Sequence, residues 1–142
     1  MSAETAAVLE TKQLVRIFTM GKYEIHAVRS VDLTVCRNEF VVLMGSSGSG
    51  KSTLLSLLGC LDMATSGSYL FEGQEVSRMS RDQKAVIRNR RIGFVFQNYN
   101  LVPRYSAAEN VLLPLQYQGR VKNMGVMALN ALEMVGLSGR AR

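Results

Sequence analysis

Gly45-Ser46-Ser47-Gly48-Ser49-Gly50-Lys51-Ser52 is the stretch of this sequence that decides its fold, and Thr53 follows it. The stretch fits the pattern G-x-x-x-x-G-K-[ST] at every fixed position. It lies between an apolar run, residues 40–44, and a segment with helix-like spacing, residues 52–61. A strand, a glycine-rich loop and a helix in this order predict a phosphate-binding loop. A flexible Gly/Ser turn is the simpler interpretation, but it does not explain the full motif spacing.

The composition of this loop suits the binding of a triphosphate. Gly45, Gly48 and Gly50 allow backbone N–H groups to converge on phosphate oxygens, and the following helix adds the positive end of its dipole. Lys51 is expected to reach the β- and γ-phosphates, and the Ser52 hydroxyl to ligate the Mg²⁺ that bridges them. A contact of Thr53 with the α-phosphate is also possible. The predicted nucleotide-binding residues are Gly45, Ser46, Ser47, Gly48, Ser49, Gly50, Lys51, Ser52 and Thr53.

Length and composition indicate one soluble domain. The chain has 142 residues, of which 47% are hydrophobic, so it can bury a sizeable core. Its apolar runs reach about five residues, against roughly 20 for a membrane span, and its first residues do not have the pattern of a signal peptide. The two cysteines, Cys36 and Cys60, have no metal-ligand spacing, and we expect small core thiols in a reducing cytosol, with Cys60 on a buried helix face.

The net charge of +6 raises the question of nucleic-acid binding. Much of the excess lies between residues 78 and 91, spread around an expected helix and without aromatic side chains for base stacking. We therefore predict a solvated basic helix and no nucleic-acid partner. Its basic residues are Arg78, Arg81, Lys84, Arg88, Arg90 and Arg91.

Hydrophobic periodicity predicts the remaining elements. Strands are expected at residues 13–18, 31–36 and 40–44, and Glu72-Gly73 indicates a hairpin between residues 68–71 and 74–76. A capping box at residues 80–83 opens a helix to about residue 89, and a second buried strand covers residues 92–96. Two buried strands are too few for a parallel sheet, so part of the core is missing.

Two further helices are expected after this strand. Ser106 and Glu109 cap the first of them, and Pro114 is expected to kink or end it. The second has a regular apolar face, which is typical of packing rather than of a cofactor site. That face consists of Met124, Met127, Ala128, Ala131, Leu132 and Val135.

Together these features resemble the ATP-binding subunit of ABC transporters, close to the lipoprotein-release and macrolide-export branch. The resemblance runs from about Leu14 onward and is carried by residues 39–53, 57–62, 92–97 and 109–115. It implies an α/β fold, a P-loop NTPase core with an N-terminal antiparallel β subdomain and the start of a helical subdomain, incomplete in this chain. We expect a loose lead-in over residues 1–10, the β and P-loop core over 11–97, and the helical part over 98–142.

The resemblance also assigns residues outside the loop. It places Gln97, at the end of a core strand, against the Mg²⁺ and the attacking water; a structural hydrogen-bonding role for this glutamine is the alternative. It places an aromatic ring on adenine, for which Phe18 fits and Tyr23 is the alternative. Packing of Phe18 at a strand end explains that residue equally well.

Two motifs of the family do not occur in this sequence. Leu137-Ser138-Gly139 continues as Arg140-Ala141 rather than as Leu-Ser-Gly-Gly-Gln, and no apolar strand ending in Asp-Glu follows. The resemblance implies an ATP- and Mg²⁺-binding subunit on the cytoplasmic face of the membrane, whose partners are transmembrane permease subunits and a second ATPase subunit. We expect an N-terminal part that hydrolyses ATP poorly by itself. A stand-alone P-loop module, and an ABC ATPase of cell division or DNA repair, are the alternatives.

Overall fold

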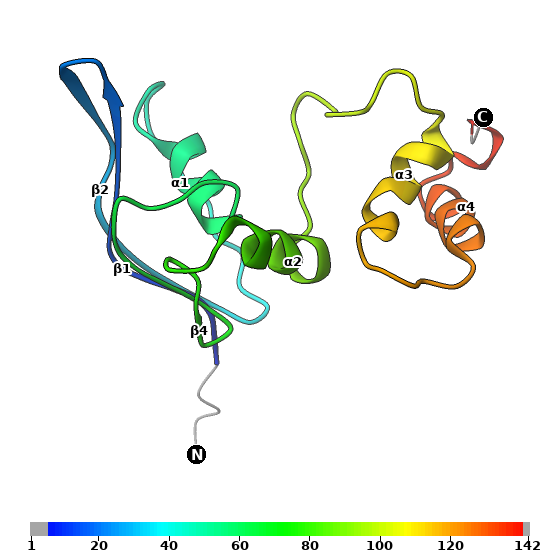
Figure 1. Ribbon diagram of the computed structural model, residues 1–142, viewed down its shortest axis with the longest axis horizontal. Helices are drawn as coiled ribbons and strands as arrows, with labels where there is room; N and C mark the ends of the chain where they lie inside the picture. The colour runs from blue at the N-terminus through cyan, green and yellow to red at the C-terminus, as the bar shows by residue number, and fades with distance from the viewer. Residues whose placement is uncertain (1–5, 141–142) are drawn as a thin grey trace. The chain divides into compact units, whose positions relative to one another are not determined.

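The protein is described by a computed structural model, which covers residues 6–140. The chain divides into two compact units, one ending at Arg88 and the other beginning at Asn89. The first unit contains a sheet and the phosphate-binding loop, and the second contains two helices (Figure 1). Among the described residues, no helix is long and apolar enough to cross a membrane.

A long antiparallel hairpin dominates the first unit. β1 (Ala7–Met20) and β2 (Tyr23–Cys36) pair along their length, with Met20 opposite Tyr23 and Leu9 opposite Val35. Both strands are longer than predicted, because each backbone continues to pair with its partner beyond the stretch where apolar and polar side chains alternate. β1 already begins at Ala7, inside the expected lead-in, and residues 1–5 of that lead-in lie outside the described part.

The hairpin predicted at Glu72-Gly73 is confirmed. β3 (Ser66–Phe71) pairs with β1 and with the short β4 (Gln74–Glu75), which gives an antiparallel sheet in the order β2-β1-β3-β4. Both turn residues, Glu72 and Gly73, have positive φ, 48° and 78°. This backbone matches the twist of antiparallel strands and explains why the Glu-Gly pair was a usable signal.

α1 (Lys51–Leu58) follows the phosphate-binding loop and packs beside β2. It is shorter than predicted, because it ends at Gly59 and the chain then turns through Cys60 with φ 58°. Leu54 and Leu57 are buried, whereas Leu55 is 57% exposed. Cys60 is buried and carries a free thiol, as expected, but it lies in this turn rather than on the helix. Cys36 also carries a free thiol and is half-buried. The buried side chains of the first unit are Thr11, Leu14, Val28, Leu54, Leu57, Cys60, Tyr69, Val76 and Lys84.

α2 (Arg81–Arg91) starts with the predicted capping box. The Ser80 N–H donates to Oε1 of Gln83 at 2.9 Å, and the Gln83 N–H donates to Oγ of Ser80 at 3.2 Å. The prediction of a solvated basic helix is wrong for Lys84, which is 4% exposed and is the buried residue of this helix.

The two predicted core strands are not formed. Residues 40–44 and 92–96 have no regular structure, and Phe40, Met44 and Val95 are 90%, 88% and fully exposed. A parallel strand is stable only between neighbours that satisfy its backbone and cover both faces. Within residues 6–140 these segments have no such neighbours, so the sequence preference alone does not form a strand.

The second unit contains α3 (Ala107–Gln116), α4 (Met124–Met134) and a short 3-10 turn, η1 (Ser138–Arg140). Ser106 and Glu109 form the predicted capping box at the start of α3, and Pro114 stands two residues before its end. In α4, only Ala128 and Leu132 of the predicted apolar face are buried, while Met127 remains 46% exposed.

Candidate nucleotide-binding site

The phosphate-binding loop has the backbone conformation that its glycines predict. Gly48 and Gly50 have φ values of 77° and 90°, in the left-handed region that glycine adopts most readily. A side chain at Gly50 would place its Cβ only 2.0 Å from the backbone oxygen of Ala27 on β2. Gly50 therefore allows the loop to rest directly against the backbone of β2, at the point where α1 begins.

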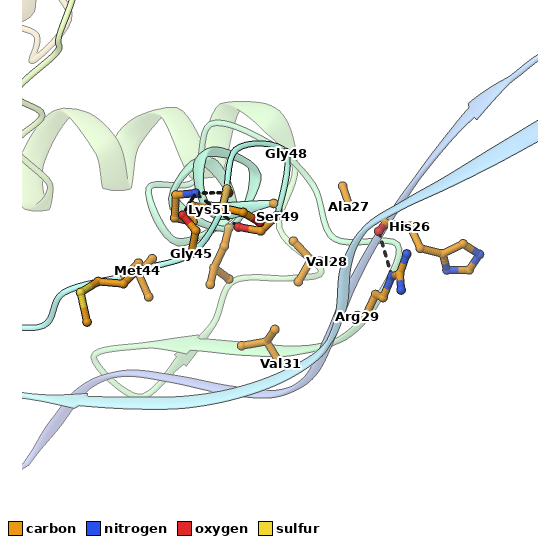
Figure 2. Close-up of a pocket in the computed structure, with 14 residues that line it drawn as sticks. His26, Ala27, Val28, Arg29, Val31, Met44, Gly45, Gly48, Ser49 and Lys51 are labelled. Atoms are coloured by element: carbon orange, nitrogen blue, oxygen red, sulfur yellow. Dashed lines mark hydrogen bonds between the residues drawn. The ribbon is translucent and has the colours of Figure 1, made fainter.

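Lys51 folds back over the loop that precedes it. Its Nζ donates to the carbonyl oxygens of Gly45 and Ser46 at 2.9 and 2.6 Å, and lies 3.3 Å from Oγ of Ser49 (Figure 2). A half-buried ammonium held above a ring of backbone groups is a positive centre for an anion. A bound phosphate would take over some of these hydrogen bonds.

A hollow of about 630 Å³ opens between the loop and β2. Val28 and Val31 form its apolar wall, and Arg29 lies beside it, where Nε donates to the His26 carbonyl at 3.3 Å. Figure 2 shows the imidazole of His26 pointing away from Lys51. The part of this wall that lies on residues 23–29 was not expected from the sequence, because no strand was predicted there. The alternation of Tyr23, Ile25 and Ala27 with more polar neighbours was the available signal.

Ser52 and Thr53 stand in the first turn of α1, with Ser52 exposed and Thr53 half-buried. An exposed hydroxyl next to the loop suits a Mg²⁺ that receives its other ligands from phosphate and water, as this ion prefers. The described residues contain no group of three acidic, histidine or cysteine side chains that could form a metal cage. Ligation of Mg²⁺ by Ser52 remains a prediction.

Phe18 lies on β1 opposite Ile25 and is 36% exposed. The guanidinium of Arg16 stacks on its ring, with 4.4 Å between the guanidinium carbon and the ring centre. Phe18 does not line the hollow beside the loop, and the alternative, Tyr23, is 79% exposed at the start of β2. An adenine-stacking role for either residue remains a prediction.

Gln97 lies in an exposed turn of the second unit rather than at the end of a strand. The phosphate-binding loop belongs to the first unit. The expected strand position of Gln97 is therefore wrong in this structure, for the same reason that residues 92–96 form no strand. Its contact with Mg²⁺ remains a prediction.

Known proteins are similar to almost all of this chain. The ABC transporter family profile matches residues 28–142. The macrolide export ATP-binding/permease protein MacB of Syntrophobacter fumaroxidans is 48% identical over 90% of this chain and 17% of its own length. An uncharacterized ABC transporter ATP-binding protein of Thermotoga maritima is 49% identical, over 94% of this chain and 57% of its own.

Solved structures agree with this assignment. A dimeric bacterial ABC transporter cassette superposes with a TM-score of 0.85 at 37% identity, covering 94% of this chain and 60% of its own. A dimeric ATP-binding cassette in a post-hydrolysis state, bound to ADP and Pi, superposes with a TM-score of 0.84 at 38% identity. The match covers 94% of this chain and 59% of the chain of that cassette. The chain thus spans less than two thirds of these relatives.

Proposed function

Because the chain belongs to the ABC transporter family, we propose that it is the ATP- and Mg²⁺-binding part of a transport ATPase that serves export or lipoprotein release. One observation carries this proposal: the loop over residues 45–52 holds Gly48 and Gly50 at positive φ, and the Lys51 ammonium lies against the carbonyl oxygens of Gly45 and Ser46. In this assignment Lys51 contacts the β- and γ-phosphates and Ser52 ligates Mg²⁺, which would neutralise charge that develops on the phosphoryl group.

The proposal assigns nucleotide binding, rather than turnover, to the 142-residue polypeptide. Phosphoryl transfer depends almost entirely on positioning and on charge stabilisation. The sequence contains neither Leu-Ser-Gly-Gly-Gln nor an apolar run ending in Asp-Glu. We therefore expect slow or no hydrolysis by this polypeptide alone.

The proposed partners are permease subunits and a second ATPase subunit. Relatives are described as a joint ATP-binding/permease protein and as dimeric cassettes, which supports this assignment by similarity.

Equilibrium binding of Mg-ATP to the whole chain tests the site. Replacing Lys51 with Ala removes the positive centre, and we expect affinity to fall by about tenfold or more, since hydrogen bonds to charged groups contribute about 1.5–3 kcal/mol. Lys22→Ala is the matched control, because Lys22 lies in the exposed turn between β1 and β2. Equal affinities for Lys51→Ala and the unaltered chain would remove Lys51 from the site.

A further inference from the structure

A second pocket, away from the phosphate-binding loop, has a strongly positive lining. It has a volume of about 340 Å³ and lies where α2 faces the turn after α1. Four cationic side chains line it, Arg16, Arg81, Lys84 and Arg88, against one carboxylate, Asp62. Arg81, Lys84 and Arg88 follow the spacing i, i+3, i+7, so α2 presents them on one face.

The single carboxylate of this pocket is already bound. Arg16 holds Asp62 through two nitrogens: Nη2 donates to Oδ1 at 2.9 Å, and Nε lies 2.9 Å from Oδ2. This paired arrangement engages both carboxylate oxygens of Asp62. Asp62 therefore balances Arg16 and leaves the charges of α2 without a full counterion.

Lys84 is the central group of the pocket. It is 4% exposed as a residue, and its ammonium, which keeps some contact with solvent, makes no hydrogen bond or ion pair with any residue between 6 and 140. Burial lowers the pKa of Lys84, although the nearby Cys60 and Asp62 act in the opposite direction. A buried lysine is costly unless something pairs with it, and a leucine or methionine would fill the same packing position without that cost.

The neighbouring arginines leave donors available at the same place. Arg88 uses Nη1 to donate to the Cys60 carbonyl at 2.7 Å, which fixes its side chain over the turn and leaves its other nitrogens free of that bond. Arg81 is exposed at the rim, in the first turn of α2. Lys84 at the base and Arg81 at the rim can thus approach one bound group from two sides.

We propose that the pocket between α2 and the turn at residues 60–63 binds a small phosphate-class oxyanion, with Lys84 as its buried counterion and Arg81 and Arg88 as further donors. Arginine and lysine together suit a tetrahedral oxyanion, because the guanidinium offers a planar pair of donors and the ammonium a compact charge. The ligand is either free phosphate or the phosphate headgroup of a lipid. The site is independent of the nucleotide site.

Titration of inorganic phosphate into the whole chain carrying Lys51→Ala tests the proposal without the main phosphate-binding loop. We expect Lys84→Met, added to this background, to weaken phosphate binding by about tenfold or more, since hydrogen bonds to charged groups contribute about 1.5–3 kcal/mol. Lys22→Met, in the exposed turn between β1 and β2, should leave binding unchanged. If Lys84→Met changes the binding neither of phosphate nor of vesicles that contain phosphatidic acid, the proposal is overturned.

Two additions make the outcome decisive. Binding to vesicles of phosphatidylcholine with phosphatidic acid is compared with binding to phosphatidylcholine alone. The ligand is a lipid headgroup if vesicle binding depends on Lys84 and the binding of free phosphate does not. Binding of neither probe overturns the proposal. If Lys84→Met fails to fold, Arg81→Ala is used in its place, because Arg81 is exposed at the rim. If Arg81→Ala changes neither phosphate binding nor vesicle binding, the proposal is also overturned.

Discussion

Replacing Gly50 with Ala tests how the phosphate-binding loop is held. An alanine there would keep a φ of 90° and bring its Cβ to 2.0 Å from the Ala27 carbonyl oxygen. The left-handed backbone costs about 1–2 kcal/mol for a residue with a side chain, and overpacking against fixed atoms adds about 1–3 kcal/mol. We expect the free energy of unfolding of the first unit to fall by about 2–5 kcal/mol, and Mg-ATP affinity to fall with it.

Gly48→Ala is the matched control. Gly48 also has a positive φ, 77°, but nothing lies within 4 Å of the position its Cβ would take. Its substitution should therefore cost only the backbone term, about 1–2 kcal/mol. Urea unfolding followed by circular dichroism measures both variants under the same conditions. Equal losses for the two alanines would show that the contact between Gly50 and β2 adds nothing to the cost, and would refute this reasoning.

Three further predictions concern the two units. Ser106→Ala removes the hydroxyl oxygen that accepts from the Glu109 N–H at 3.2 Å in the capping box, so the second unit should lose about 1 kcal/mol of stability, measured by thermal unfolding; no loss would contradict the cap. Asp62→Asn should cost about 1–3 kcal/mol in urea, because Arg16 loses its charged partner. Glu10→Gln, which discharges the partner of the exposed Lys12, should cost less than Asp62→Asn, and equal costs would argue against the Arg16 pair. Lys84→Met should be more stable than the unaltered chain at neutral pH. Burial lowers the pKa of Lys84 in the folded state, so the unfolded state binds more protons as the pH rises toward about 10.5. The stability advantage of Lys84→Met should therefore shrink over this range. An advantage that grows with pH would contradict the burial of Lys84. The measured quantity is the difference in the free energy of unfolding between the two chains, followed across pH, because Cys60, Asp62 and Arg88 also act on this ammonium.

Elements specified by neighbouring residues could be predicted from the sequence. The Glu72-Gly73 turn and the capping boxes at Ser80 and Ser106 depend on contacts within a few residues, and the positive φ of Gly48 and Gly50 is a property of the phosphate-binding loop itself. Each has a recognisable signal because a cap or a positive φ favours few residue types. These local features also place most of the predicted nucleotide-binding residues.

Features that depend on distant partners could not be predicted in the same way. Residues 40–44 have the composition of a buried strand, yet Phe40 is 90% exposed, because composition does not supply the neighbouring strands. Lys84 shows the opposite error: a lysine on a basic helix reads as exposed, and only the turn at Cys60 and Asp62 buries it. Gln97 was expected to end a strand, and its surroundings changed with that strand.

The loop therefore has unequal support at its two ends. On the side of α1, Gly50 rests against Ala27 and the Leu54 N–H donates to the Gly50 carbonyl at 2.8 Å, so the sheet and the helix fix this end. On the other side, the loop continues from Met44, which is 88% exposed in a segment without pairing. Lys51 bridges the two ends, since it binds Gly45 and Ser46 from the first turn of α1. Any chain that pairs with residues 40–44 thus restrains the carbonyl groups that Lys51 holds. By linkage, binding of a phosphate at Lys51 must favour that pairing to the same extent that the pairing favours the phosphate.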